Sequence, residues 1–342
     1  MKTSDLLNLL IRLSNAFGPV GYEEEAIDVI KEKINPFVDE IYVDNIGNLI
    51  AHKKGTGKKI AFFTHMDEIA LVISTVDEKG FARFDTMGGI DPKILISQRV
   101  KIKSRDGKTR TGIIGMLAPH LQNKETRKEV PHYDDLFIDV SMNPDYEKVT
   151  TGDLAVVDIT SYMLKDKVIG KALDDRACCV ISILLAEQLD KYSSVPELYF
   201  VFTTREEVGG LGAQVASQTI QPDLAVVMDV TQDSNDSGIS MGKGPVLGVG
   251  GPIVHKKYYK NLKNIAKKKN VQVQYEYTPG RSGTDADSVQ IAGKGVPTLI
   301  LSIPQKHMHS PVEVINPKDI EESVRLLESF VESLKEGETN EV

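Results

Sequence analysis

The strongest constraint on the fold is a change of pattern in the middle of the chain. Between about residues 71 and 162, short alternating segments such as "LVISTV" and "RTGIIGML" are separated by Gly, Asp and Pro turns, and helix-length periodicity is nearly absent. On both sides of this stretch, apolar strands alternate with helical segments. The simplest interpretation is an α/β domain (residues 1–69 and 163–342) interrupted by a small all-β barrel or sandwich (residues 70–162).

Composition narrows the classes of function. A net charge of −8 disfavours a nucleic-acid-binding surface, and no apolar run approaches the ~20 residues of a membrane span. The N-terminal segment lacks the long apolar region of a signal peptide. The two cysteines, Cys178 and Cys179, are chain neighbours, which rarely form a disulfide. We therefore expect two small packed side chains on a helix, in a reduced, cytoplasmic protein.

Metal-ligand residue types follow the apolar strands of the α/β part. "IAFFT" leads to His65, "LYFVFTT" to Glu206 and Glu207, and "LAVVM" to Asp229. In open α/β sheets, ligands bind beyond the carboxyl ends of the strands, so we expect these side chains at one edge. The full set of polar residues at these ends is His65, Asp67, Asp174, Asp175, Glu206, Glu207, Asp229, His307 and His309.

Each of these residues has an ordinary structural explanation when taken alone. An imidazole held by an acid in a turn accounts for His65 and Asp67, and Asp174 with Asp175 could begin a helix, where acids stabilise the helix dipole. Asp229 could be a turn residue. These explanations do not account for five separate segments that bring the same residue types to one predicted edge. That convergence favours a binding site.

The predicted crowding of acids points to cations. Carboxylates gathered in one cleft repel strongly at low dielectric, and several would be protonated without nearby positive charge. Two divalent cations would remove that repulsion, with one carboxylate bridging them. Imidazole and carboxylate donors suit Zn²⁺, Co²⁺ or Mn²⁺, whereas the lack of thiolate ligands argues against a closed structural zinc site. The residues therefore predict a pair of divalent cations.

Six motifs, in order along the whole chain, resemble the M42 family of metallo-aminopeptidases, the TET aminopeptidases. They are "THMDEIALVI", "GKALDDRACCVI", "TTREEVGGLGA", "VVMDV", "SGTDAD" and "GVPTLILSIPQKHMHSPVE". The resemblance implies a mixed-sheet α/β di-metal aminopeptidase domain with an inserted small all-β domain, barrel- or PDZ-like, through which subunits dimerise. It also implies that six dimers form a hollow tetrahedral dodecamer that admits short unfolded peptides.

The resemblance also implies roles for individual residues. Glu206 would be the general base, and Asp67 would orient His65, as metal-bound imidazoles usually require. The cofactor would be two divalent metal ions per subunit, with Zn or Co favoured over Mn. The implied metal ligands are His65 and Asp229 for one ion, Glu207 and His309 for the other, and Asp174 as the bridge between the two ions.

The sequence departs from the family pattern just before "MHSP". Family members usually carry Arg followed by Tyr or Thr there, whereas this chain has Gln305, Lys306 and His307. On a strand His307 would point the same way as His309. We expect His309 to be the ligand, and His307 either lines the substrate pocket or has no role in it. Basic candidates for a substrate contact are Arg205, Lys243 and Arg281.

The activity that we expect is metal-dependent hydrolysis of the N-terminal peptide bond of short peptides, and two alternatives stay open. The first alternative is a glycoside hydrolase. In such an enzyme the two carboxyl groups flank the sugar at a separation of ~5–9.5 Å, whereas Glu206 and Glu207 are chain neighbours. The chain also has no Trp, a residue well suited to covering a sugar face. A non-catalytic scaffold has no reason to keep a complete ligand set together with Glu206.

Overall fold

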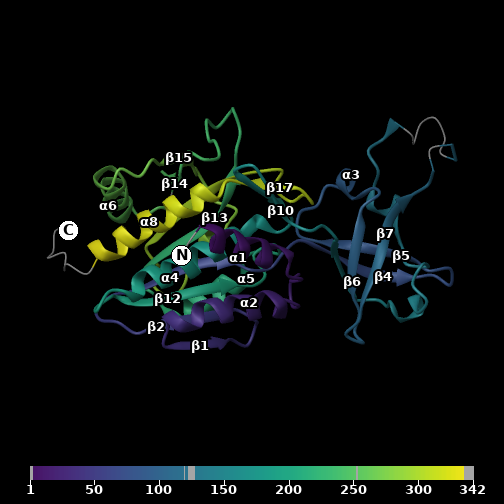
Figure 1. Ribbon diagram of the computed structural model, residues 1–342, viewed down its shortest axis with the longest axis horizontal. Helices are drawn as coiled ribbons and strands as arrows, with labels where there is room; N and C mark the ends of the chain where they lie inside the picture. Colours follow the sequence, from purple (N-terminus) through teal and green to yellow (C-terminus); the bar gives the residue numbers. More distant parts are fainter. Residues whose placement is uncertain (1–2, 119, 122–127, 252, 335–342) are drawn as a thin grey trace.

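An eleven-stranded mixed sheet occupies the larger part of the molecule (Figure 1). The computed structural model describes residues 3–118, 120–121, 128–251 and 253–334. In spatial order the strands are β1 (Glu40–Val43), β2 (Leu49–Lys53), β12 (Glu197–Thr203), β3 (Lys59–His65), β13 (Leu224–Gln232), β16 (Thr298–Lys306), β17 (Glu313–Ile315), β11 (Lys167–Gly170) and β10 (Tyr162–Leu164). Off this path, β14 (Val246–Val249) pairs with β16, and β15 (Gln274–Tyr277) pairs with β14.

The four central strands β12, β3, β13 and β16 run parallel to one another. Their residues are almost continuously buried, as expected for a parallel sheet covered on both faces. In the register, Thr203 at the end of β12 lies beside His65 at the end of β3, and Asp229 in β13 lies beside Ser302 in β16. The polar residues predicted at the strand ends therefore share one edge of the sheet.

Helices cover both faces of this sheet. One face is packed by α1 (Thr3–Asn15), α2 (Glu24–Ile34), α4 (Leu173–Asp190), α6 (Lys256–Lys268) and α8 (Pro317–Ser333), and the other by α5 (Leu211–Ile220) and α7 (Ala286–Val289). Helix α4 is buried almost all round because α1, α2 and α8 contact it on the sides away from the sheet. Cys178 and Cys179 are free and fully buried on α4, as predicted.

The start of α4 differs from the regular helix that the sequence predicts after Asp174. Asp174 and Asp175 have non-helical backbone angles, and the peptide bond between them is cis. The segment that includes both aspartates therefore turns sharply before the regular part of α4 begins. This turn lies at the edge where the parallel strands end.

Six strands in the middle of the chain close into a barrel. The order is β4 (Ala70–Val76), β5 (Phe81–Met87), β8 (Leu136–Asp139), β7 (Thr109–Met116), β6 (Arg99–Lys103) and β9 (Leu154–Val157). Buried and exposed residues alternate along these strands, so the inward side chains form a separate hydrophobic core. Among its described residues, this region also contains the short helices α3 (Pro92–Leu95), η3 (Tyr133–Asp135) and η4 (Tyr146–Lys148), and a further short helix, η1 (Asn35–Phe37), follows α2.

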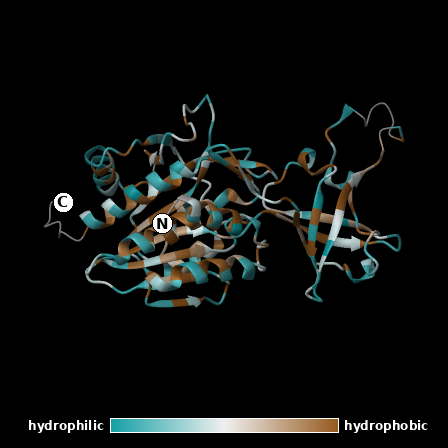
Figure 2. Ribbon diagram, in the orientation of Figure 1, coloured by the Kyte–Doolittle hydropathy of each residue, from teal (hydrophilic) through white to brown (hydrophobic). Residues whose placement is uncertain are grey.

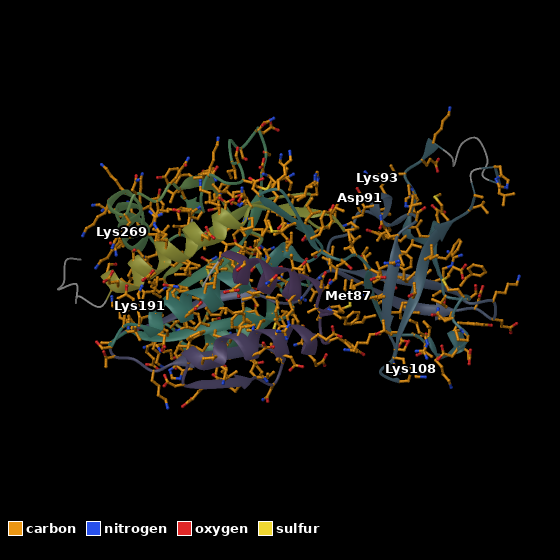
Figure 3. The ribbon with its side chains drawn as sticks, viewed as in Figure 1. Met87, Asp91, Lys93, Lys108, Lys191 and Lys269 are labelled. Atoms are coloured by element: carbon orange, nitrogen blue, oxygen red, sulfur yellow. The ribbon has the colours of Figure 1, made fainter. Side chains whose placement is uncertain are left out.

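The barrel lies at one end of the long axis of the molecule (Figure 1). Hydrophobic residues are concentrated on the strands of the large sheet, whereas the outer helices carry a mixture (Figure 2). A small apolar cluster that includes Phe17, Ala70 and Met87 joins the two parts, and Figure 3 shows Met87 at this junction. Among the residues that the structure describes, none of the helices combines the length and apolar character of a membrane span.

Candidate metal centre and active site

Histidine and carboxylate side chains from five segments meet at the common edge of the parallel strands. His65 ends β3, Glu206 and Glu207 follow β12, and His309 follows β16. Asp174 Oδ1 lies 3.0 Å from His65 Nε2, and its Oδ2 lies 3.3 Å from His309 Nε2. The same His309 nitrogen lies 3.4 Å from Glu207 Oε2. Asp174, which the resemblance implies as the bridging ligand, therefore lies between the two imidazoles.

Two groups of these side chains have the spacing to hold a cation. One contains His65, Asp174 and Glu207, and the other contains His65, Asp175 and Asp229; within each group the donor atoms all lie within 4.8 Å of one another. The donor set of imidazoles and carboxylates fits Zn²⁺, Co²⁺ or Mn²⁺. Buried Asp175 Oδ1 has no hydrogen-bond partner among the described residues. Asp175 lies in the predicted strand-end set, but the resemblance gave it no role as a ligand.

The carboxyl groups of this edge are held in an environment that disfavours their charge. Burial raises the pKa of Glu206 to about 8, with Asp285 and Glu207 adding to the effect and His65 opposing it. Burial and the charge of Asp174 raise the pKa of Glu207 to about 7. Burial also raises the pKa of Asp229 well above its usual value. The protein thus gathers acids here without enough positive charge of its own to keep them ionised.

Asp174 is the exception among these acids. Burial would raise its pKa, but hydrogen bonds from His309 and His65 outweigh that effect and lower it. In return, the hydrogen bond to Asp174 raises the pKa of His309 to about 9. The two imidazoles therefore act as the local positive charges for this one carboxylate, which is the position that a cation would occupy.

Asp67 holds the turn that carries the two glutamates. Its carboxylate oxygens accept hydrogen bonds from the backbone N–H of Glu206 at 3.3 Å and of Glu207 at 3.2 Å. Its carboxylate lies 3.7 Å from His65 Nδ1, whereas its backbone carbonyl lies 3.1 Å from the same nitrogen. Asp67 thus contacts His65 and also fixes the backbone of both glutamates.

Two buried acids that the sequence reasoning did not select support the edge. Glu313 Oε2 accepts from the backbone N–H groups of Leu173 (2.7 Å) and Asp174 (3.2 Å), and its Oε1 accepts from His309 N–H (3.0 Å). Asp285 Oδ2 accepts from the Thr203 hydroxyl at 2.5 Å, and burial raises the pKa of Asp285 to about 6. Both lie in the quoted motifs "HSPVE" and "SGTDAD", which is the signal that could have identified them.

The inserted region also reaches the site. The loop after β5 brings the Gly89 carbonyl oxygen to 2.8 Å from His309 Nδ1. A Cβ atom at Gly89 would lie 3.2 Å from this nitrogen, and one at Gly88 would lie 2.7 Å from Ile69 and 3.2 Å from Glu207 Oε2. Glycine at both positions allows the loop to approach the imidazole and the glutamate closely.

The predicted substrate contacts lie at the periphery. β16 ends at Lys306, and His307 is an exposed residue with a positive φ of 58°. Glu207 and His309 border three described cavities, and His307 lines none of them. Arg281 does line one of these cavities, although 92% of its side chain is exposed and its Nε lies 3.7 Å from Asp287. Of the other basic candidates, Lys243 lines a separate cavity, and Arg205 lies in the turn after β12.

Comparison with known proteins agrees with the motifs. The sequence profile described as M42 glutamyl aminopeptidase matches residues 47–326. A putative aminopeptidase of Acetivibrio thermocellus is 36% identical (96% of this chain, 98% of the relative), and the lysyl aminopeptidase of Pyrococcus furiosus is 34% identical (96% and 97%). The solved structure of the Pyrococcus horikoshii TET1 peptidase, which can assemble into a tetrahedron or a large octahedral shell, is 31% identical with a TM-score of 0.86 (95% and 99%).

These similarities extend over nearly the full length of the relatives, so they include both the large sheet and the barrel. Aminopeptidases of this family are hydrolases that use two metal ions, and the described residues provide candidate histidine and carboxylate groups for metal binding. The aminopeptidase names of the relatives do not favour the glycosidase alternative. By its sequence, its fold and the residues gathered at the sheet edge, the chain belongs to the M42 family of aminopeptidases.

Proposed function

We propose that this chain removes N-terminal residues from short peptides at a centre for two divalent cations. The ligands would be His65, Asp174, Glu207, Asp229 and His309, with Glu206 as the general base. The observation that carries this proposal is the cluster of buried carboxyls with raised pKa values around Asp174 and its two imidazoles. Such a cluster is stabilised when cations replace the protons that burial would otherwise impose.

The chemistry divides between the cations and the chain. When bound, the two cations polarise the scissile carbonyl and lower the pKa of a water nucleophile. Glu206 accepts a proton from the attacking water and returns it to the leaving amine. Its raised pKa of about 8 would fall toward neutrality beside a cation, which is the useful range for a group that both accepts and donates a proton.

The neighbouring residues would keep these roles separate. Asp67 fixes the backbone of both glutamates, so Glu207 can face the centre while Glu206 stays free to exchange a proton. Glu313 holds the backbone on both sides of the centre, at Asp174 and at His309. Such supporting contacts keep ligands oriented for binding. The donor set favours Zn²⁺ or Co²⁺, with Mn²⁺ as the third option.

Family membership leaves the preferred N-terminal residue open, because the Pyrococcus furiosus relative is named for lysine and the family profile for glutamate. The proposal includes a catalytic domain of residues 1–69 and 163–342 and an inserted dimerisation domain of residues 70–162. It also includes a cytoplasmic setting, which the two free cysteines support.

Dimers that assemble into a dodecamer are a further part of the proposal. The relative that forms a tetrahedron supports this assembly, and so do exposed apolar residues of the barrel region such as Ile113 and Met142. Light scattering on the purified protein measures the assembly directly. A stable monomer at working concentration would contradict it.

A metal-reconstitution assay tests the activity itself. The protein is stripped with EDTA and assayed on a panel of aminoacyl-p-nitroanilides before and after addition of Zn²⁺, Co²⁺ or Mn²⁺. We expect the stripped protein to be inactive, because the carbonyl is then not polarised, and activity to return with at least one of the ions. Release of p-nitroaniline that persists unchanged in EDTA, or no release under any condition, would contradict the proposal.

A further inference from the structure

Among the described residues, Glu207 and His309 border three cavities that differ in size and charge. The first, between barrel and sheet, is lined by apolar barrel side chains together with charged residues such as Glu68 and Lys171, and its volume of only about 30 Å³ is too little for a long side chain. The second, which we call the β15 cavity, has a volume of about 310 Å³ and runs from the candidate ligands along β13 and β15 to residues 282–284. The third, which we call the Arg281 cavity, measures about 360 Å³.

The β15 cavity contains a carboxylate that the proposed chemistry does not use. Glu276 on β15 is half-buried and lines the cavity wall. The buried Thr231 hydroxyl on β13 donates to Glu276 Oε1 at 2.7 Å, which fixes the orientation of the carboxylate. Neither lysine nor arginine lines this cavity, and none of the described basic side chains forms an ion pair with Glu276. Its charge therefore has no partner within the described protein.

Loading the centre with cations would leave this charge in place. Glu276 belongs to neither candidate metal group, so cations bound there would not pair with it. It stays a negative group without an ion-pair partner in a partly enclosed space. A carboxylate in such a position attracts a cationic group of a ligand and repels an anionic one.

The Arg281 cavity on the other side of the two glutamates has a different character. It is lined by Gly209, Gly210, Arg281 and Asp287, so it carries charges of both signs and a wall of glycine backbone. Because the two larger cavities meet at Glu206 and Glu207, a peptide cleaved there can extend into both. The mixed and glycine-rich one suits the variable leaving peptide, whereas the β15 cavity suits one defined side chain.

We infer that Glu276 makes this enzyme select substrates with a cationic side chain, lysine or arginine, at the N-terminus. This inference rests on the proposed aminopeptidase function and names its substrate class. The side chain of the first residue enters the β15 cavity, and its ammonium or guanidinium group pairs with Glu276, which Thr231 holds in place. A charge-assisted pair of this kind distinguishes a cationic residue from an apolar residue of equal length.

The test compares lysine with norleucine, which has the same carbon chain without the ammonium group. The metal-loaded protein is assayed on Lys- and norleucine-p-nitroanilide, whose leaving group has no side chain that could reach the cavities. We expect the ratio of kcat/KM values, Lys over norleucine, to fall roughly tenfold or more in Glu276→Gln. Thr231→Val should lower the ratio less, because the carboxylate remains but loses its fixed orientation. Glu147→Gln, the same charge loss at an exposed barrel residue, should leave the ratio unchanged.

Binding provides a readout that does not depend on turnover. Calorimetric titration of the metal-loaded protein with free lysine and with norleucine should show tighter binding of lysine to the wild type, and a loss of that difference in Glu276→Gln. An equal loss for both amino acids would mean that Glu276 holds the α-amine, and that result would overturn the inference. Two other results would also overturn the inference. One is a Lys-over-norleucine ratio that does not change in Glu276→Gln. The other is a change in preference that appears only for the second residue, when Ala-Lys is compared with Ala-norleucine.

The two proposals fail in distinguishable ways. A wild-type protein that releases p-nitroaniline from no substrate, with any of the three metals, contradicts the proposed function. A wild-type protein that is active but shows no preference for lysine over norleucine leaves the aminopeptidase function intact and overturns the role of Glu276 alone.

Discussion

The barrel and the metal centre handle buried charge in opposite ways. In the barrel, Arg110 is 3% exposed and pairs with Asp106 at 2.8 Å and Asp145 at 2.7 Å, and these contacts lower the pKa of both carboxyls. At the centre, burial raises the pKa of Glu206 and Glu207 to about 8 and about 7. The barrel provides its own cation, whereas the centre needs cations from solution. Function is concentrated where the chain leaves negative charge unbalanced.

We expect the largest effect from a substitution that removes the proposed proton acceptor, Glu206, from the metal centre. In Glu206→Gln the side chain keeps its shape and loses its basicity, so kcat should fall by about 10²–10⁴-fold while metal content stays near that of the wild type. Metal content by plasma emission spectroscopy and kcat on one substrate measure the two quantities. Loss of metal in this variant would contradict the assignment of Glu206 as base and Glu207 as ligand.

Asp174→Asn provides the matched control for that prediction. The amide side chain that this substitution introduces is nearly isosteric with the carboxylate, but it cannot bridge two cations as a carboxylate does. We expect this variant to lose both metal and activity, whereas Glu206→Gln loses activity alone. A fully metal-loaded and active Asp174→Asn protein would contradict the proposal that Asp174 bridges the two cations.

The dependence of stability on pH and metal should separate the centre from the barrel. Raised carboxyl pKa values mean that the folded, metal-free centre holds protons that the unfolded chain releases above about pH 4.5. The metal-free protein should therefore lose stability as the pH rises from about 5 to about 8. Added Zn²⁺ or Co²⁺ should raise Tm by more at pH 8 than at pH 5.5, because binding needs ionised carboxylates. Differential scanning fluorimetry with EDTA and with metal measures both shifts.

The two carboxylates that pair with Arg110 in the barrel should change stability with pH in the opposite direction. Because the pKa values of Asp106 and Asp145 are lowered, their contribution is present above the unfolded carboxyl pKa of about 4 and is lost as the pH falls below it. The barrel should therefore not share the loss of stability between pH 5 and pH 8. A metal-free protein whose Tm rises steadily across that range would contradict the contrast between the two regions.

We expect the smallest effect from a substitution in the barrel, where Arg110 balances the charge of two carboxylates. Arg110→Met leaves Asp106 and Asp145 facing each other without their shared cation, so the barrel should lose local stability, with a modest decrease in Tm. Metal content should not change, because the pair lies outside the centre. Hydrogen exchange of the barrel strands is the measurement, and Lys108→Met, at an exposed neighbouring position (Figure 3), is the control. A loss of bound metal in Arg110→Met without faster hydrogen exchange of the barrel strands would contradict the separation between barrel and metal centre.

The convergence of the strand-end residues could be predicted because it follows from the period of the sequence and from the geometry of parallel strands. His65, Glu207 and Asp229 each follow or end a run of apolar residues, and parallel strands place such ends at one edge. The alternating pattern of residues 70–162 likewise predicts a small β structure. Whether it closed into a barrel depended on strand pairing, which a period of two residues does not specify.

The supporting acids could not be predicted in the same way. Glu313 acts through hydrogen bonds to backbone N–H groups of Asp174 and His309, and these contacts depend on how two loops fold rather than on residue spacing. The position of His307 also depends on where a strand ends. Because β16 stops at Lys306, the alternation of side chains along a strand, which would point His307 and His309 the same way, does not apply. Glu276 was missed because its strand carries no metal-ligand motif and its importance comes from the cavity that it lines.

The contact between Gly89 and His309 has a consequence for how the inserted barrel relates to the chemistry. A backbone carbonyl only accepts a hydrogen bond, so this contact keeps a proton on Nδ1 of His309. When a cation replaces the proton that Nε2 shares with Asp174, the lone pair of Nε2 is therefore the one that faces the centre. Asp67 does the same for His65 through its own carbonyl. One imidazole therefore has its tautomer fixed by the α/β part of the chain and the other by the insertion. An enzyme with the barrel excised would keep every proposed ligand and still lose the choice of nitrogen at one of them.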